Sequence, residues 1–468
     1  MAFYDGLLEI CGFEKIEIDL QRPRMENLFS KINIGPEDMD RVEKRVTRQH
    51  DIKLKGVRKL LRAWLLELAD LVLAHEEGKR IVYYGYPSIQ GPGMAIKAAL
   101  GENAYVGCPD VVLCHSLGLI FDGLTPILEA AENRGLPPGH GLCSLQQIRN
   151  GGLDLGIIPV PDLVTGSSYY CDMGSKADEL LHEIYGHPAV YVDGSMDSRW
   201  GEYPRYDPKK IVFLGAQLNK LFTKVEDILG AKVTRDCMHE AMNTSRQLFS
   251  ALGRLTYQMM ADPVPISAVV SGMALNLAAA STGISMSEGP DAINILCQEV
   301  QQRVDAGIGI TVKGAPRVLN FAVPFSDPEI THMMERAGLA LAASFVTVPP
   351  VKRDPSLCFE TLGEELAEAA MRGGAYHSTY GFAKRFAQAA SALKMDGVIW
   401  GYQYNCRPLA LGSHLFKQVI EEEAGVPTLS LEMDLYESRS YSAEALRTRV
   451  EAFAEILRAK KALKQKDQ

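Results

Sequence analysis

Residues 396–408 read Asp-Gly-Val-Ile-Trp-Gly-Tyr-Gln-Tyr-Asn-Cys-Arg-Pro, and this stretch indicates the fold class. Its apolar part, Gly397–Trp400, is typical of a buried strand. Polar residues follow, and Cys406 stands where the strand gives way to the next element. In open α/β folds such strand-to-helix junctions face the crevice where ligands bind. The stretch therefore predicts an α/β fold with a cysteine at its ligand crevice.

Two more cysteines have a similar context. Cys143 lies in Gly-His-Gly-Leu-Cys-Ser, after a Pro-Pro-Gly turn that leads into an expected helix. Cys171 lies in Ser-Tyr-Tyr-Cys-Asp-Met-Gly-Ser-Lys, between an apolar strand and a helix expected near Lys176. We expect all three cysteines at strand-to-helix junctions, where helix N-termini stabilise thiolates and anionic clusters.

Other readings of these cysteines are less specific. Scattered cysteines are often inert core thiols, but the polar residues Ser144, Asp172 and Arg407 directly after them do not continue a core strand. No two of the three form a Cys-X-X-Cys pair, which argues against a structural zinc site.

The remaining cysteines carry weaker signals. Cys108 lies in a Gly-Cys-Pro-Asp turn and Cys114 follows an apolar run, so both are candidates for additional ligands or redox thiols. The other four have no activating group nearby in the sequence, and we interpret them as structural: Cys11, Cys237, Cys297 and Cys358.

The alternation of strand and helix patterns predicts two doubly wound (Rossmann/flavodoxin-like) domains. Residues 1–77 are expected to form a helical N-terminal segment, in which Leu54–Glu76 has the spacing of an amphipathic helix. The first α/β domain is placed at 78–209 with two of the cysteines, a helical connector at 210–305, and the second α/β domain at 306–468 with the third cysteine.

Individual elements follow from local patterns. In the first domain, Arg80–Tyr84 is expected as a strand, and helical segments then alternate with the short apolar runs Val111–Leu113, Ile157–Pro159 and Ala189–Val192. In the second domain the expected strands are Arg317–Val323, Phe345–Val348, Gly397–Trp400 and Thr428–Leu431. The expected helices there are Pro328–Ala343, Gly381–Leu393, Gly412–Gly425 and a C-terminal helix that opens near Ser442.

Composition excludes several classes of protein. The chain has 468 residues, 47% of them hydrophobic and 23% charged, which is ordinary for a protein with a large core. A net charge of −9 argues against nucleic-acid binding. Met1–Phe13 lacks a secretory pattern, and Ala268–Ala280 is too short and interrupted for a membrane span. We therefore expect a cytoplasmic protein whose nine cysteines are reduced thiols or metal ligands.

The ordered motifs resemble the 2-hydroxyacyl-CoA dehydratase and benzoyl-CoA reductase family, over roughly Lys79 to Leu457. The resemblance rests on segments that occur in the family's order: Cys143-Ser144, Pro161-Asp162-Leu163-Val164, Cys171-Asp172 with Lys176, Asp396-Gly397-Val398 before Cys406, Gly425-Val426-Pro427-Thr428-Leu429, Glu432-Met433-Asp434 and Arg449-Val450-Glu451-Ala452-Phe453. The segment before Lys79 has no feature that matches.

This resemblance implies a 4Fe-4S cluster bound by Cys143, Cys171 and Cys406, with the fourth iron open to water or substrate. It implies a homologous second subunit and a separate ATP-dependent iron–sulfur activator. The chain itself has no Gly-X-X-X-X-Gly-Lys-Ser/Thr loop, so the ATP chemistry is expected in that other protein. The double-cubane relatives need further cysteines, which Arg317–Ser326 does not supply.

The implied activity is radical-type chemistry on an acyl-CoA thioester, either dehydration of a 2-hydroxyacyl-CoA or reduction of an aromatic acyl-CoA. A non-catalytic subunit that relays electrons is an alternative, as is a cluster-free CoA-binding protein. The acid and base groups stay open, because several side chains near the cysteines in sequence are equally plausible: His115, His140, Glu183, His187, Tyr402, Tyr404, Arg407, Glu432 and Asp434.

Overall fold

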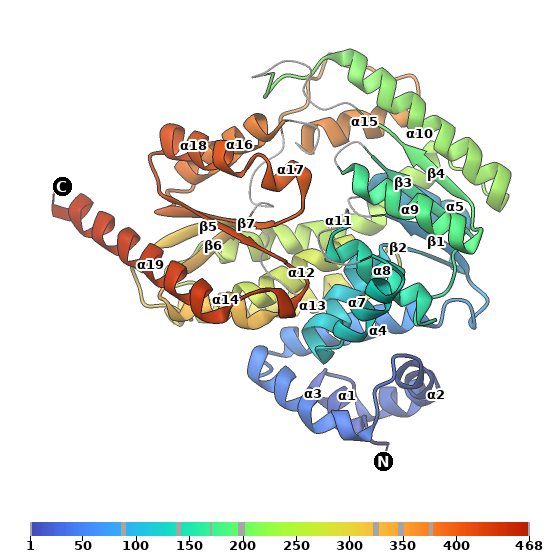
Figure 1. The fold of residues 1–468 in the computed structure, drawn as a ribbon, viewed down its shortest axis with the longest axis horizontal. Coiled ribbons are helices and arrows are strands. Elements are labelled where there is room, and N and C mark those ends of the chain that lie inside the picture. The colour runs from blue at the N-terminus through green and yellow to red at the C-terminus, as the bar shows by residue number, and fades with distance from the viewer. Residues whose placement is uncertain are drawn as a thin grey trace.

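The computed structural model describes residues 2–85, 90–136, 142–168, 171–194, 202–321, 327–344, 351–373 and 378–466. These residues form two four-stranded sheets, each flanked by helices, on opposite sides of the molecule (Figure 1). The strand orders are β2-β1-β3-β4 and β6-β5-β7-β8, and all paired strands are parallel. The predicted α/β class with two doubly wound sheets is confirmed.

Four helices precede the first sheet, and they lie at the bottom of Figure 1: α1 (Asp5–Ile10), α2 (Lys15–Lys31), α3 (Pro36–Gln49) and α4 (Lys55–Val72). The helix predicted from Leu54 is α4, although it ends earlier than predicted. Most of its residues are buried, and the Trp64 indole Nε1 donates a hydrogen bond to the Met273 carbonyl oxygen at 3.2 Å. This N-terminal helical layer therefore shares its core with the rest of the chain.

The first unit consists of the β2-β1-β3-β4 sheet and its helices: β1 (Arg80–Tyr84), α5 (Gln90–Leu100), β2 (Ala104–Gly107), α6 (Pro109–Leu113), the π-helix η1 (Cys114–Phe121), α7 (Thr125–Asn133), α8 (Ser144–Asp154), β3 (Leu163–Ser167), α9 (Asp172–Tyr185) and β4 (Ala189–Val192). The strand order changes direction between β1 and β3: the chain passes from β1 outward to β2 and then returns to β3 on the other side of β1. This position is the topological switch point, where ligands bind in such folds.

Two of the short apolar runs that were expected as strands between helices are not strands. Val111–Leu113 belongs to α6, because Pro109 sets the backbone of the first helical turn. Ile157–Pro159 lies in an irregular turn, and the strand follows it as β3. Of the three runs, only Ala189–Val192 is a strand.

Four helices connect the two sheets: α10 (Pro208–Leu229), α11 (Arg235–Gln258), α12 (Ala268–Ala280) and α13 (Ile284–Asp305). Helix α13 packs so closely on α4 that a Cβ on Gly56 would lie 2.4 Å from the Leu296 Cα. Among the described residues, no helix has the length and apolar character needed to cross a membrane.

The second unit consists of the β6-β5-β7-β8 sheet and its helices: β5 (Arg317–Phe321), α14 (Pro328–Arg336), β6 (Ala340–Ser344), α15 (Leu362–Gly373), α16 (Thr379–Ala392), β7 (Gly397–Gln403), α17 (Arg407–Ala410), α18 (Ser413–Ala424), β8 (Thr428–Met433), the 3₁₀ turn η3 (Ser438–Ser440) and α19 (Ala443–Lys466). Helices α14 and α19 bury one face of this sheet in a core of their own.

One helix in this unit was predicted too long. The expected helix Pro328–Ala343 ends at Arg336, because Gly338 adopts a φ of +83°. The Ala-rich run that follows is strand β6, paired with β5. The expected strand at Phe345–Val348 lies outside the described residues.

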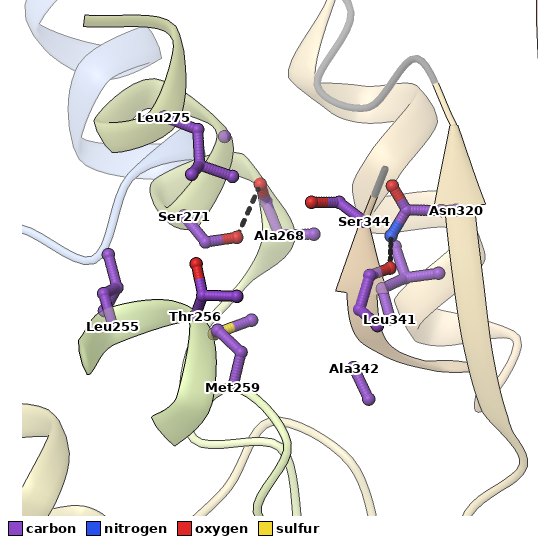
Figure 2. A pocket seen from close by; sticks show the side chains of 12 residues that line it. Leu255, Thr256, Met259, Ala268, Ser271, Leu275, Asn320, Leu341, Ala342 and Ser344 are labelled. Carbon is purple, nitrogen blue, oxygen red and sulfur yellow. Dashed lines mark hydrogen bonds between the residues drawn. The ribbon is translucent and has the colours of Figure 1, made fainter. Parts of the chain in front are cut away.

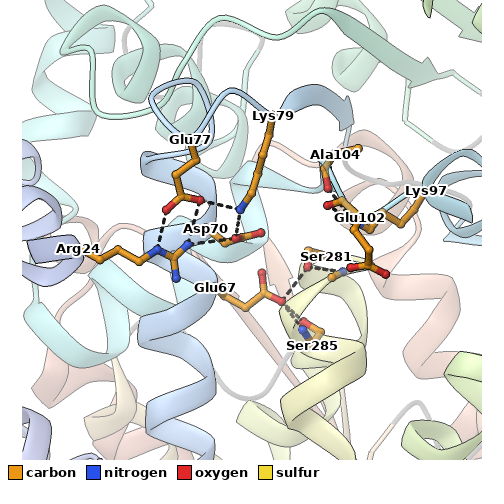
Figure 3. Close-up of polar contacts among 11 residues, drawn as sticks. Arg24, Glu67, Asp70, Glu77, Lys79, Lys97, Glu102, Ala104, Ser281 and Ser285 are labelled. Atoms are coloured by element: carbon orange, nitrogen blue, oxygen red, sulfur yellow. Dashed lines mark hydrogen bonds and ion pairs between the residues drawn. The ribbon is translucent and has the colours of Figure 1, made fainter. Parts of the chain in front are cut away.

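A buried carboxyl group links α4 to the connecting helices (Figure 3). Glu67 accepts hydrogen bonds from the Ser281 hydroxyl at 2.7 Å and from the Ser285 backbone N–H at 2.5 Å, and a further one from the Ser285 hydroxyl. Burial raises the pKa of Glu67 to about 7, although these hydrogen bonds oppose the rise. Glu67 therefore holds its proton in the folded protein at mildly acidic pH.

This raised pKa predicts how stability depends on pH. Between pH 4.5 and 7 the folded protein holds a proton that the unfolded chain releases, so Glu67 makes folding less favourable as the pH rises through this range. The free energy of unfolding of Glu67→Gln should match that of the wild type near pH 5. At pH 8 it should be higher than that of the wild type, by up to about 3 kcal/mol. Thermal unfolding of both proteins from pH 5 to 8 measures this, and parallel curves for the two would contradict it.

Candidate functional site

The three cysteines singled out in the sequence each occupy a helix N-cap. Cys143 precedes α8, Cys171 precedes α9 and Cys406 precedes α17, all with extended backbone and half-buried side chains. A residue in this position lies beside the unpaired N–H groups and the positive dipole end of its helix, which favour a thiolate. The two longer helices, α8 and α9, supply most of this effect.

The elements before these cysteines differ from the prediction in one case. Cys171 follows β3 and Cys406 follows β7, each at the carboxyl end of a strand. Both strands flank their sheet's switch point, beside β1 and β5 respectively. For Cys143, the preceding element in the described part of the chain is not a strand but helix α7.

The structure brings the three thiols close enough to influence one another. Burial raises the pKa of Cys143 far above its usual value, and Cys171 and Cys406 raise it further. Burial also raises the pKa of Cys406 to about 12, with Cys171 again adding to the effect. Two thiols from the first unit and one from the second therefore lie within electrostatic reach of one another.

Hydrogen bonds between the two units surround this place. The Asn405 amide nitrogen donates to the Leu142 carbonyl oxygen at 2.8 Å, and the Ser144 hydroxyl donates to the Asp434 carboxylate. Arg407 pairs with Asp172. Each of these contacts involves a residue directly next to a cysteine.

Asp434 is the central acceptor in this arrangement. Its carboxylate also accepts from the Gln403 amide nitrogen at 2.7 Å and from the Tyr436 backbone N–H at 3.0 Å, while Gln403 accepts from the Leu435 N–H at 2.8 Å. Burial raises the pKa of Asp434, although the hydrogen bond from Ser144 opposes the rise. The sequence indicated a carboxylate after this strand but not its contact with Ser144.

A buried ionic network fixes the two cysteine-bearing helices of the first unit. Arg149 on α8 lies 2.7 Å from Asp178 on α9 and 3.6 Å from Asp110 on α6, and all three side chains are at most 1% exposed. Burial raises the pKa of both carboxyls, while the Arg149 guanidinium lowers it. A Cβ on Gly85 would lie 2.6 Å from Asp178, so the strand end leaves room for these charges. The sequence gave no signal for this network.

Of the remaining cysteines, Cys114 also lies within electrostatic reach of Cys143, whereas Cys108 caps the short helix α6. Cys108 and Cys114 are fully buried, and burial raises the pKa of both thiols well above its usual value. Cys108 lies 3.6 Å from Asp110, at the edge of the ionic network. The other four lie in unrelated places: Cys11, Cys237, Cys297 and Cys358.

Most of the acid and base candidates have other partners. His115 stacks on Trp64 with ring centroids 5.1 Å apart, and burial lowers its pKa to about 4. His187 is buried beside Pro188, and Glu183 is exposed on α9. The Tyr402 hydroxyl donates to Glu432 at 3.2 Å within the second sheet. His140 lies outside the described residues.

Tyr404 lies within electrostatic reach of Asp434 and Cys143. Burial raises its pKa, and those two groups raise it further. The Tyr404 hydroxyl therefore keeps its proton at neutral pH and can act as a hydrogen-bond donor.

Within the described residues, no three His, Cys, Asp or Glu side chains are arranged to hold a single metal ion. A single ion needs ligands at about 2 Å from one point. By contrast, the cysteines of a four-iron cluster each bond a different iron, so their sulfurs stand farther apart. The three half-buried thiols at helix N-termini, set apart from the fully buried Cys114 near Cys143, fit the donor set of such a cluster with one open iron.

The cavities elsewhere are of other kinds. The pocket in Figure 2 lies between α11, α12, β5 and β6 and has about 20 Å³ of free space, enough for one water molecule. Asn320 lines it with a buried, unpartnered Oδ1 that such a water would satisfy. A larger hollow of about 340 Å³ between α3 and α14 is lined by paired charges such as Glu329 and Arg336. None of the three cysteines lines either cavity.

Two doubly wound units that meet at three helix-capping thiols define an α/β protein with a cysteine site between its sheets. The 2-hydroxyglutaryl-CoA dehydratase D-component family matches residues 107–457. The chain belongs to this family, and the predicted family resemblance is confirmed.

Two characterised proteins are similar to this chain. The alpha subunit of (R)-2-hydroxyglutaryl-CoA dehydratase from Acidaminococcus fermentans is 21% identical over 309 residues, which cover 64% of this chain and 61% of that protein. The (R)-phenyllactyl-CoA dehydratase alpha subunit from Clostridium sporogenes is 22% identical over 342 residues, covering 71% and 80%. The chain thus spans less than two thirds of the first relative.

The raised thiol pKa values predict slow alkylation in metal-free protein. At pH 8, Cys406 should react with iodoacetamide about tenfold or more slowly than the exposed Cys358, because only the thiolate reacts. Peptide mass spectrometry after timed labelling measures both rates. In urea the two rates should become equal, whereas equal rates in the folded protein would contradict the raised pKa.

Proposed function

We propose that this chain is the iron–sulfur subunit of an enzyme that removes water from a 2-hydroxyacyl-CoA. The observation that carries the proposal is the convergence of Cys143, Cys171 and Cys406 at helix N-termini between the two sheets. Membership of the family supports the reaction class. The names of the two relatives favour dehydration over reduction of an aromatic ring.

The three thiolates would hold a 4Fe-4S cluster, two from the first unit and one from the second. When bound, such a cluster supplies a low-potential electron and, at an iron without a cysteine, a Lewis-acidic site. Binding it requires loss of the thiol protons, and the N–H groups at the starts of α8 and α9 stabilise the resulting charge.

Other residues of the chain would prepare the site for substrate. Tyr404 stays protonated and can donate a hydrogen bond to an oxygen of the substrate. Arg407 places a half-exposed positive charge beside Cys406, held by Asp172 and by contact with Met173 at 2.9 Å. These side chains orient a polar substrate, and their acid or base roles are not required for the proposal.

The proposal includes two protein partners. Both relatives are named as alpha subunits, which supports a second subunit for this chain. Because the sequence has no phosphate-binding loop, we propose that a separate ATP-dependent iron–sulfur activator delivers the electrons.

Activity of the assembled complex tests this function. The chain is co-expressed anaerobically with a homologous second subunit and assayed with an ATP-dependent activator, on 2-hydroxyglutaryl-CoA and phenyllactyl-CoA as probes. The expected result is loss of water to an enoyl-CoA that requires the activator and ATP. Turnover without either would overturn the proposal, and electron uptake without dehydration by any subunit pair would favour an electron-relay subunit instead.

The ligand set predicts which cysteines bind iron. After anaerobic reconstitution the wild type should hold about four irons per chain. Cys143→Ala, Cys171→Ala and Cys406→Ala should each lose most of this iron. Cys237→Ala and Cys297→Ala serve as controls, because these thiols lie on the connecting helices α11 and α13, with Lys232 and Ala251 as their partners. Iron and sulfide analysis measures the content, and full iron in one of the first three variants would remove that residue from the set.

A further inference from the structure

The contacts between the two units fall on the residues beside the cysteines. Leu142 and Ser144 flank Cys143, Asp172 follows Cys171, and Asn405 and Arg407 flank Cys406. The Leu142–Asn405, Ser144–Asp434 and Asp172–Arg407 contacts all cross from the first unit to the second. Each contact involves a residue covalently joined to a cysteine, so each acts on the backbone that carries a sulfur.

The first two contacts are the more rigid. The Leu142 carbonyl and the Ser144 hydroxyl lie on either side of Cys143, and Ser144 is 1% exposed. The acceptor of the Ser144 hydroxyl is held in turn, because Asp434 also accepts from Gln403 and from the Tyr436 N–H. Cys143 is therefore fixed from both sides against the segment that carries Cys406.

The third contact links the segments that carry Cys406 and Cys171. Arg407 reaches from the residue after Cys406 to Asp172, the residue after Cys171. Asp172 also pairs with Lys176 at 3.2 Å, but that pair lies within α9 and does not cross between the units. The two cations that meet Asp172 are both about half exposed, so they form a matched pair for comparison.

The connecting helices also hold the second unit at places away from these three contacts. The Tyr206 hydroxyl before α10 donates to Glu368 on α15 at 3.0 Å, and Arg235 on α11 pairs with Glu365 at 3.1 Å. Helices α10 and α15 lie side by side at the top of Figure 1. Loss of a contact beside the cysteines should therefore leave the overall fold in place.

We propose that the Leu142–Asn405, Ser144–Asp434 and Asp172–Arg407 contacts form a clamp that sets the spacing of the three sulfurs before a cluster is present. The clamp residues are positioning residues, since they act through the cysteines beside them. This inference rests on the proposed ligand role of the cysteines. It adds that the metal-free protein is already shaped to receive the cluster and to retain it.

The experiment compares clamp variants with controls that keep all cross-unit contacts. Ser144→Ala and Arg407→Gln each remove one contact of the clamp, and the double variant removes both. Ser175→Ala and Lys176→Gln are the controls, because the hydrogen bonds of these side chains within the described structure go to Asp172 on their own helix. Thermal unfolding of all variants checks that they have the same fold and similar stability.

Two readouts follow the spacing of the sulfurs. In metal-free protein, prolonged treatment with a short bifunctional thiol reagent such as dibromobimane, long enough to offset the slow reaction of both buried thiols, should join Cys143 to Cys406 in the wild type and the controls, and much less in the double variant. In reconstituted protein, transfer of iron to a chelator should be about tenfold faster in the double variant. The reason is that loss of a hydrogen bond to a charged group changes an equilibrium by about that factor or more.

The outcomes separate the clamp from the proposed function. Reduced cross-linking in the double variant supports the clamp, whether or not the wild type takes up iron. Failure of the wild type to take up iron would overturn the proposed function. If iron binds, but cross-linking and iron release in the clamp variants equal those of the controls, the clamp is overturned and the ligand role of the cysteines stands.

Discussion

The convergence of thiols from two separately wound sheets is the constraint on which this structure depends. Cys143 and Cys171 belong to the first unit and Cys406 to the second, so no local segment can bring them together. Their meeting requires the switch-point edges of both sheets to face one another. The helices α4, α12 and α13 supply that placement, because they share one continuous hydrophobic core with both sheets.

Buried charge serves the same geometry within the first unit. Arg149 joins the helices that begin at Cys143 and Cys171 through its pair with Asp178. Removing one member of such a buried pair leaves an uncompensated charge, which typically destabilises a protein by about 3–5 kcal/mol. The ionic network thus ties the orientation of two helix N-termini to the stability of the fold. The proposed cluster would depend on both.

The sequence allowed prediction of those features that have local signals. The polar residue after each cysteine indicated that a helix follows, and the structure shows one directly after each. Two of the starts were expected too late, because α9 begins at Asp172 rather than near Lys176, and the short helix α17 precedes the helix expected from Gly412. Strands with weak local patterns were missed. Ala340–Ser344 consists largely of alanine, which favours helix, and is a strand only because it pairs with β5.

Contacts between distant segments lie beyond such reasoning. Ser144 and Asp434 are 290 residues apart, and no local pattern joins them. The same holds for Arg149 and the two aspartates, because each residue alone reads as an ordinary surface charge. Tertiary packing creates these partners, and with them the relative positions of the cysteines.

Mössbauer spectroscopy of the chain reconstituted anaerobically with ⁵⁷Fe tests the central claim most directly, since it reports the ligands of each iron. Three cysteines on a 4Fe-4S cluster predict that about one iron in four has a distinct spectrum that changes when an acyl-CoA or other ligand is added. A spectrum in which all four irons have equivalent thiolate coordination, or one typical of isolated iron ions, would contradict the account.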